Sequence, residues 1–248
     1  MSHTPNSLSG PALAGEWPLV AAQPGIWVAD QISPHRNAYA VAHAIELNGP
    51  IAVEPLLQAI IQGLGEVDML RLRFAERDGV PVQWLDDALA VHEPELVDLT
   101  TSPDPEAAAR ALMDIDLASD LRAGSGAPLY RHVVMRLADN RWFWYQRYHH
   151  LLVDGFSFTA IARRVAAIYT HLCRGDALEP TPFTAFSDVV AEYQAYREAP
   201  AWQRDADFWL EKARQLPPPA TLCPQPLAGQ TPTPRIHRLE QRCDPQAF

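Results

Sequence analysis

The apolar positions between residues 53 and 64 repeat with the period of a helix that buries one face. They fall at i, i+3, i+4, i+7, i+8 and i+11, namely Val53, Leu56, Leu57, Ile60, Ile61 and Leu64. Pro55 lies in the first turn of this helix, where a proline is tolerated. A second helix is expected to begin at Asp104-Pro105, an N-cap followed by a first-turn proline, and to run to about Leu121.

Alternating, β-rich stretches separate the helices and predict strands at 38–47, 70–75, 81–85, 129–137 and 141–149. Asp139 and Asn140 stand between the last two runs, as a short hairpin turn would. From Phe158 onward, apolar residues repeat with the period of a helix, so a helix is predicted there. Gly175 is placed where that helix would end. Two more helices are expected at about 183–197 and 202–216, and the prolines at 217–219 stop the last one.

Strands with interspersed helices predict an α/β fold with a sandwich-like layer arrangement. Residues 1–17 are rich in Ser, Pro and Gly and show no apolar period, so we expect a flexible lead-in there. Residues 18–216 are predicted to form the folded domain. The segment 217–248 holds eight prolines and is predicted to be a linker.

Composition argues against three kinds of function: nucleic-acid binding, a membrane-spanning protein and a metal centre. The net charge of −10, without any cluster of Lys and Arg, argues against nucleic-acid binding, which depends on neutralising phosphates. No run of 18 apolar residues and no secretory h-region is present, so we expect a cytoplasmic protein without a membrane span. Three widely spaced cysteines, without a histidine placed to complete a zinc site, predict reduced thiols and no metal centre.

The run from Tyr148 to Gly155 lies where a strand ends and a helix is about to begin, a usual place for a reactive group. Adjacent strand residues face opposite ways, so one of His149 and His150 works at a reacting centre and the other supports it. Asp154 is expected to bond the loop or to pair with a cation. Gly155 leaves room for a second backbone or a thin ligand. Core imidazoles and an incidental metal site remain alternatives for the two histidines.

Residues 149–155 (HHLLVDG) match the His-His-x-x-x-Asp-Gly motif, and the chain thereby resembles the condensation domains of nonribosomal peptide synthetases. Other signatures of that family appear in order. Residues 22–27 (AQPGIW) resemble its opening Ala-Gln-x-x-x-Trp helix, 70–74 (LRLRF) resemble Leu-Arg-x-x-Phe of its second motif, and 186–188 (FSD) resemble its fourth. The resemblance covers nearly all of residues 18–225.

The resemblance implies a chloramphenicol acetyltransferase-like two-layer sandwich, of which this chain is the N-terminal half of a condensation domain. By family position, His150 is the catalytic residue, while His149, Asp154 and Gly155 support it. The family's second motif often begins Arg-His-Glu, and its arginine pairs with the motif aspartate. This chain has Glu66-Val67-Asp68 there, so Arg71 is considered as the substitute ion-pair partner of Asp154.

The family forms amide bonds between two thioesters. An acyl group on the phosphopantetheine arm of one carrier protein is attacked by the amine of an aminoacyl group on a second carrier. Family members of catecholate siderophore synthesis imply a 2,3-dihydroxybenzoyl donor on an aryl carrier protein and a seryl acceptor on a peptidyl carrier protein. No cofactor is expected to bind directly, and the chain without the domain's second half is expected to be inactive. The alternatives are a free-standing CoA-dependent acyltransferase of the same fold and a non-catalytic carrier-docking fragment.

Three further assignments concern the neighbourhood of the motif. Ser157 is interpreted as a helix cap in preference to a nucleophile. Trp142 and Trp144 share the strand parity of His150, and core packing is favoured for them over a role in lining an acyl pocket. His132, His171 and His237 have no partner at a useful spacing in the sequence.

Overall fold

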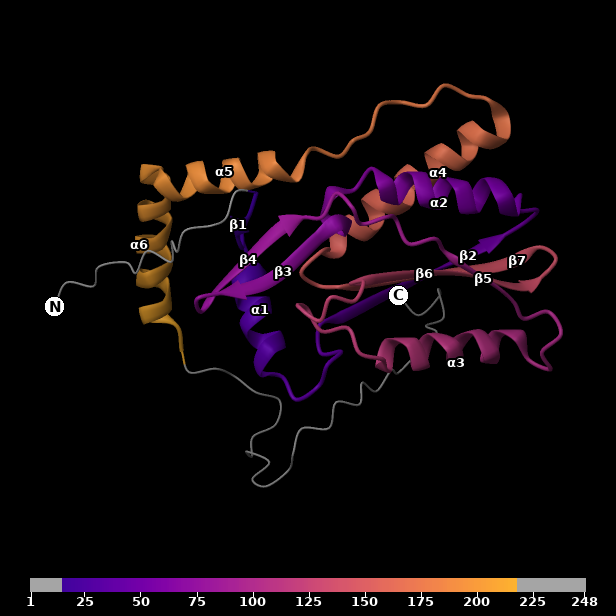
Figure 1. Cartoon of the computed structure of the whole chain (residues 1–248), viewed down its shortest axis with the longest axis horizontal. Coiled ribbons are helices and arrows are strands. Elements are labelled where there is room, and N and C mark those ends of the chain that lie inside the picture. Colours follow the sequence, from indigo (N-terminus) through magenta and orange to yellow (C-terminus); the bar gives the residue numbers. More distant parts are fainter. Residues whose placement is uncertain (1–14, 218–248) are drawn as a thin grey trace, which may run out of the picture. The chain divides into compact units, whose positions relative to one another are not determined.

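The structure is a computed structural model that describes residues 15–217 (Figure 1). Two units can be distinguished, one formed by residues 15–202 and one by residues 203–217, and the boundary falls within the helix α6 (Pro200–Gln215). Most of the predicted lead-in, 1–17, and nearly all of the predicted linker, 217–248, lie outside the described residues.

A four-stranded mixed sheet forms the centre of the first unit. Its strands run in the order β2-β7-β6-β5, with bounds Ala40–Asn48, Arg141–His149, Tyr130–Ala138 and Glu95–Asp98. The pairs β2–β7 and β6–β7 are antiparallel, and β5–β6 is parallel. The hairpin predicted around Asp139 and Asn140 is confirmed, because β6 and β7 pair on either side of it.

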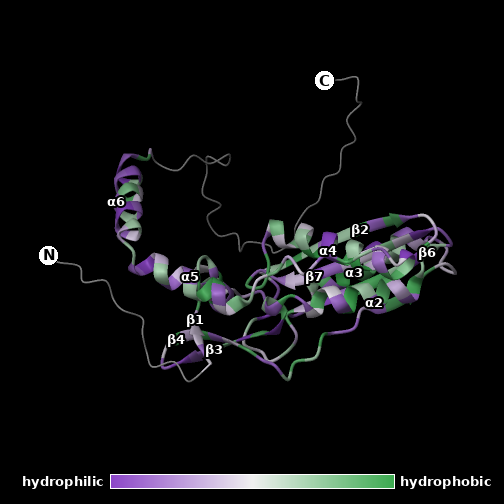
Figure 2. Cartoon of the chain, turned by 90° about the horizontal axis from the view of Figure 1, so that it is seen from above, coloured by the Kyte–Doolittle hydropathy of each residue, from purple (hydrophilic) through white to green (hydrophobic). Residues whose placement is uncertain are grey.

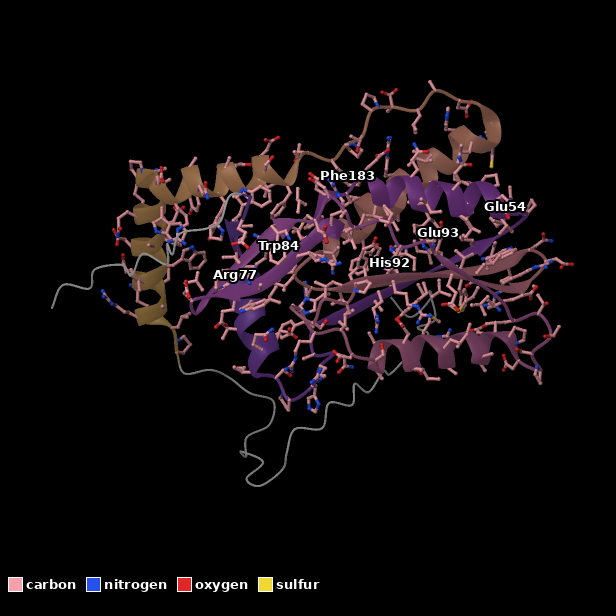
Figure 3. All side chains as sticks on the ribbon, in the orientation of Figure 1. Glu54, Arg77, Trp84, His92, Glu93 and Phe183 are labelled. Atoms are coloured by element: carbon pink, nitrogen blue, oxygen red, sulfur yellow. The ribbon has the colours of Figure 1, made fainter. Side chains whose placement is uncertain are left out.

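A second, smaller sheet is antiparallel with the order β1-β4-β3, and its strands span Trp17–Pro18, Val80–Leu85 and Leu72–Arg77. The short 3-10 helix η1 (Asp68–Arg71) precedes β3. The Arg77 guanidinium lies 5.7 Å from the ring centroid of Trp84 and bridges β3 and β4 by a cation–π contact (Figure 3). The segment with His92 and Glu93 follows β4 and leads to β5.

Six α-helices belong to the described residues: α1 (Gln23–Ile32), α2 (Val53–Gly65), α3 (Pro105–Ala118), α4 (Gly155–Arg174), α5 (Phe186–Glu198) and α6. The predicted signals act as expected in two of them. The Asp104 side chain accepts a hydrogen bond from the Ala107 N–H at 3.0 Å and caps α3. Gly175 ends α4 in a left-handed conformation, φ 74°, which glycine adopts without strain.

Helices cover both faces of the four-stranded sheet (Figure 1). The helices α2 and α4 pack against one face over a large apolar core that includes Ile60, Val134, Trp144 and Ile168. The helix α3 covers the other face over a smaller cluster that includes Ala109, Met135 and Phe143. Figure 2 shows hydrophobic positions concentrated on α2 and the sheet, and hydrophilic positions along much of α6. The predicted α/β arrangement is confirmed, and α3 adds a layer on the second face.

The boundaries differ from the predictions where contacts distant in sequence intervene. The predicted end of α3 at Leu121 is wrong, because the Ser119 N–H and Oγ both bond to the Asp116 carbonyl and close the helix at Ala118. The strands β1 and β5 are short and were not predicted. Each is held by pairing with a strand far along the chain.

Candidate active site

The motif residues lie on a tight turn between the end of β7 and the start of α4. His149 is the last residue of β7, and its N–H donates to the Leu129 carbonyl at 2.8 Å. The His150 N–H donates to the carbonyl of Tyr39, just before β2, at 2.9 Å. The Leu152 N–H returns to the His149 carbonyl at 2.9 Å. The turn is therefore fixed by backbone hydrogen bonds to both neighbouring strand ends.

His149 is buried and faces α1. Its Nδ1 accepts a hydrogen bond from the Leu151 N–H at 3.1 Å, so the ring proton of the neutral imidazole is on Nε2. Nε2 lies 3.6 Å from Oδ1 of the buried Asp30. Burial lowers the pKa of His149, and the neighbouring Asp30 carboxylate opposes that shift. His149 is therefore an interior residue between the Leu151 N–H and the Asp30 carboxylate.

His150 is exposed and has the opposite tautomer. Its Nδ1 lies 2.8 Å from the Val153 carbonyl oxygen, which can only accept, so Nδ1 carries the proton and donates it. The lone pair of Nε2 is left to accept a proton from outside the turn. A neutral imidazole held in this way is equipped to act as a general base.

Asp154 is the N-cap of α4 and forms a capping box with Ser157. Its Oδ1 accepts hydrogen bonds from the Phe156 N–H, the Ser157 N–H and the Ser157 Oγ–H at 3.1, 2.9 and 2.7 Å. The Ser157 hydroxyl oxygen in turn accepts from the Asp154 N–H at 3.1 Å. These bonds, the Ser157 hydroxyl first, lower the pKa of Asp154. The helix therefore begins three residues before the expected Phe158, and Ser157 takes part in the cap from its third position.

The structure does not pair Arg71 with Asp154. The two terminal nitrogens of Arg71 instead contact Asp68 at 2.5 Å and Asp87 at 2.8 Å. Glu66, in the place of the family's arginine, instead accepts two hydrogen bonds from the buried Arg164 of α4, at 2.6 and 2.8 Å. The charge pair between the second motif and α4 is thus made by residues other than those considered from the sequence.

Gly155 stands beside open space. A Cβ atom built on it would meet no heavy atom within 4 Å. Packing against the described residues therefore does not require a glycine at this position.

The aromatic residues of β7 lie in the core, as favoured from the sequence. Trp142 and Trp144 are both buried in the cluster under α2 and α4. The expectation that His132 lacks a partner is wrong, because the Trp144 Nε1–H donates to its Nδ1 at 3.1 Å. Burial lowers the pKa of His132 to about 3. The histidine on the neighbouring strand is a neutral core residue.

An apolar cavity of about 420 Å³ lies between β2 and α4, along the same face of the sheet. His43, Trp144, Ala162 and Tyr169 are among the residues that line it. The Phe158 ring packs edge-on against both His43 and Tyr148, with centroid distances of 5.6 and 5.2 Å. Trp144 therefore also borders a cavity, in addition to packing in the core.

Two further observations bear on the function classes. Within residues 15–217, no three His, Cys, Asp or Glu side chains gather as metal ligands would. None of the helices in that range has both the length and the apolar composition needed to cross a bilayer.

The family model of the condensation domain matches residues 13–245 of this chain. The chain belongs to the condensation domain family. It is 55% identical over 223 residues to enterobactin synthase component F of Escherichia coli, and the match covers 90% of this chain and 17% of that protein. It is 36% identical over 208 residues to vanchrobactin synthetase VabF of Vibrio anguillarum, covering 82% of this chain and 7% of that one.

Solved condensation domains share the fold. The starter condensation domain of rhizomide synthetase RzmA, in complex with C8-CoA, superimposes with a TM-score of 0.79 at 31% identity. The match covers 86% of this chain and 48% of that one. This condensation domain chain therefore spans about half the length of the solved domains that it matches. The expected chloramphenicol acetyltransferase-like fold is confirmed by these neighbours.

Two residues of this condensation domain were not singled out as site residues from the sequence. Asp30 faces the ring of His149, and the Gln23 Nε2–H donates to the Leu151 carbonyl at 3.1 Å. Both lie on α1 and are buried. Their signal in the sequence is the placement of polar residues seven positions apart on the side of a helix that also presents Trp27 to the core.

Proposed function

We propose that this chain contributes the base of an amide-forming condensation reaction, and that His150 is that base. The observation that carries the proposal is the ring of His150, exposed at the turn and bonded through Nδ1 to the Val153 carbonyl. The bond directs the free lone pair of Nε2 outward. Membership of the condensation domain family supports the reaction class.

The reaction joins an amine to a thioester carbonyl. The neutral α-amino nitrogen of the acceptor attacks the carbonyl carbon of the donor, and a C–N bond forms. Nε2 of His150 takes the proton that the nitrogen must lose, the C–S bond breaks, and the departing thiolate of the donor arm receives that proton, which returns His150 to its neutral form. An α-amino group has a pKa of about 8, so a useful fraction is neutral near pH 7 and a strong base is not required. His150 therefore orients the amine as much as it deprotonates it.

The substrates are proposed from the resemblance to siderophore synthetases. Similarity to enterobactin synthase component F supports a 2,3-dihydroxybenzoyl donor and a seryl acceptor, as in synthesis of a catecholate siderophore of the enterobactin type. Both groups would arrive on phosphopantetheine arms, the donor on an aryl carrier protein and the acceptor on a peptidyl carrier protein. We place the reaction in the cytoplasm, where such carriers are loaded.

The second half of the domain is proposed as a further partner. The chain spans 48% of a solved condensation domain, and His150 lies on an exposed turn. A second half that covers this turn would order two flexible arms and exclude water, which an open surface does not. We therefore expect the 248-residue chain alone to form no measurable amide, and activity to return when the second half is joined to it.

A second candidate function is acyl transfer from a diffusible CoA thioester. The RzmA starter domain was solved in complex with C8-CoA, which favours this candidate as an alternative donor. Equal turnover of 2,3-dihydroxybenzoyl-CoA and of the same acyl group on an aryl carrier would support it. A strong preference for the carrier supports the condensation reaction. Carrier binding without turnover by either route would indicate the docking fragment.

The test of the proposal compares His150→Ala with His171→Ala in a protein that contains both halves of the domain. His171, near the C-terminal end of α4, controls for loss of an imidazole from the region. We expect His150→Ala to lower kcat by about 10² to 10⁴-fold and to remain folded, with only the small loss of stability that follows from losing the bond to the Val153 carbonyl. His171→Ala should keep its activity. Near-normal amide formation by a folded His150→Ala protein would refute the assignment.

A further inference from the structure

The helix α1 points two buried polar side chains at the motif turn. Gln23 and Asp30 are seven residues apart, which places them on one face of the helix two turns apart. Both are buried, and a buried polar group is unfavourable unless it is hydrogen-bonded. Asp30 faces His149, as described above. The partners of Gln23 show a second role for this face.

The Gln23 amide joins three separate segments. Its Oε1 accepts from the Val20 N–H and from the Gln83 Nε2–H, both at 2.9 Å, and its Nε2–H donates to the Leu151 carbonyl at 3.1 Å. These partners fix the orientation of the amide. The Val20 N–H can only donate and the Leu151 carbonyl can only accept, so a flipped amide would lose both bonds.

The smaller sheet holds Gln23 from behind. Gln83, on β4, is fully buried, and its Nε2 also donates to the Pro18 carbonyl of β1 at 3.0 Å. The side chain is thereby fixed to its own sheet while it supports the amide of Gln23. The three-stranded sheet is in this way connected to the turn that carries His150.

Leu151 is bonded on both sides. Its N–H donates to Nδ1 of His149, and its carbonyl accepts from Gln23. The next bond in the turn joins the Val153 carbonyl to Nδ1 of His150. Because Leu151 lies directly between His150 and Leu152-Val153 in the chain, a shift of its peptide group would move the carbonyl that sets the tautomer of His150.

We infer that Gln23 is a positioning residue for His150. By holding the Leu151 carbonyl, it keeps the Val153 carbonyl on Nδ1 and the lone pair of Nε2 directed outward. The effect of Gln23 on turnover rests on the proposed function of His150. The effect of Gln23 on the tautomer of the His150 ring does not. Gln23 touches no reacting atom in this assignment.

Two substitutions separate this role from a general loss of stability. Gln23→Glu keeps an oxygen acceptor for the Val20 N–H and the Gln83 amide, but the carboxylate cannot donate to the Leu151 carbonyl. Gln23→Leu removes all three bonds. The control is Tyr145→Phe, which removes the buried hydrogen bond from the Tyr145 hydroxyl to Asp116 at 3.0 Å, on the other face of the sheet.

The first measurement is the ¹⁵N chemical shifts of the His150 imidazole in the folded chain, at a pH where the ring is neutral. We expect the parent and Tyr145→Phe to show the proton on Nδ1, and Gln23→Glu to show a mixture of the two tautomers. In the protein with both halves, Gln23→Glu should lower kcat by at least about tenfold with little change in the KM for either carrier. Its pH profile of kcat should shift, and that of Tyr145→Phe should not.

If Gln23→Glu fails to fold, Gln23→Leu is measured in its place and the same tautomer change is expected. If both fail to fold, Gln83→Leu is used. A smaller tautomer change is expected in Gln83→Leu, because only the hydrogen bond that supports Gln23 is lost. A folded variant at position 23 that leaves the His150 tautomer as in the parent would overturn the inference. Because that measurement needs no turnover, it decides the positioning role even if His150→Ala proves active.

Discussion

The two faces of β7 have different chemistry. Toward α2 and α4, the contacts are made by neutral polar groups: Trp144 of β7 donates from its Nε1–H to the buried His132 of β6. Toward α3, charges meet: the buried Arg147 pairs with the buried Asp116 at 3.0 Å, and the partly exposed Arg131 of β6 pairs with the same carboxylate at 2.6 Å. Because side chains alternate along a strand, one residue of register decides which of these surroundings a β7 side chain enters.

The adjacent histidines follow this division. His149 has the parity of Arg147 and meets the Asp30 carboxylate on the charged side. His150 has the parity of Trp144 but comes after the last residue of the strand, so its ring is exposed. The sheet therefore buries one imidazole beside an acid and presents the other at its edge, with its Nδ1 bonded to the Val153 carbonyl.

The largest effect is expected from removing the acid on the α3 face. Asp116→Ala leaves the buried Arg147 without its carboxylate, and an unpaired buried cation costs about 3 to 5 kcal/mol. The measurement is urea unfolding of the chain. Glu46→Ala, which breaks the partly exposed pair with Arg141 at 2.6 Å, is the control and should cost less than about 1 kcal/mol. Equal losses in the two variants would show that the α3 face gains nothing from burying its charges.

The buried neutral histidine on the α2 and α4 side should make the free energy of unfolding depend on pH. Burial lowers the pKa of His132 to about 3 in the folded chain. Below about pH 6.5, His132 is therefore protonated in the unfolded chain but stays neutral in the folded chain. The stabilising contribution is therefore complete above pH 6.5 and is lost as the pH falls from 6.5 toward 3, by about 1.4 kcal/mol per pH unit. The lowered pKa of His149 acts in the same direction.

His132→Gln tests this contribution. The amide oxygen of the new side chain can accept from Trp144 but does not titrate in this range. Between pH 6.5 and 4.5, the dependence of the unfolding free energy on pH should be less steep than in the parent by about 1.4 kcal/mol per pH unit, which corresponds to one proton. His92→Gln, which removes an exposed imidazole, is the control. An unchanged slope in His132→Gln would mean that His132 is charged, or reaches solvent, in the folded chain.

The sequence was sufficient for features that depend on local pattern. The apolar period gave α2 almost to the residue, and the alternation along 141–149 gave β7 and the burial of Trp142 and Trp144. It was insufficient where the partner lies far along the chain. Glu66 finds Arg164 across 98 residues, and Gln23 finds Leu151 across 128, and no spacing rule relates such pairs. The roles of the motif residues came from resemblance and stay predictions.

The smallest effect is expected at the helix caps, and there it separates a structural aspartate from a catalytic one. Asp154 caps α4 on the site side, and Asp104 caps α3 on the other face. Because each accepts hydrogen bonds only from its own first helical turn among the described residues, either alanine substitution should cost about 0.5 to 2 kcal/mol. Asp154→Ser should restore most of the loss, since serine also caps well. The two alanine variants are compared by thermal unfolding and, in the protein with both halves, by amide formation.

We expect the loss of activity in Asp154→Ala to exceed that in Asp104→Ala by only a few-fold. Loss of the Asp154 carboxylate frays the first turn of α4 next to His150, but it removes no hydrogen bond from the imidazole itself. Asp154 donates nothing to His150, and the ring is held by Val153. A variant of Asp154 that keeps the stability of the parent and loses amide formation as completely as His150→Ala would contradict this reading. It would place the carboxylate in the reaction, and the division between a charged, structural face and a neutral, reactive one would not hold at the start of α4.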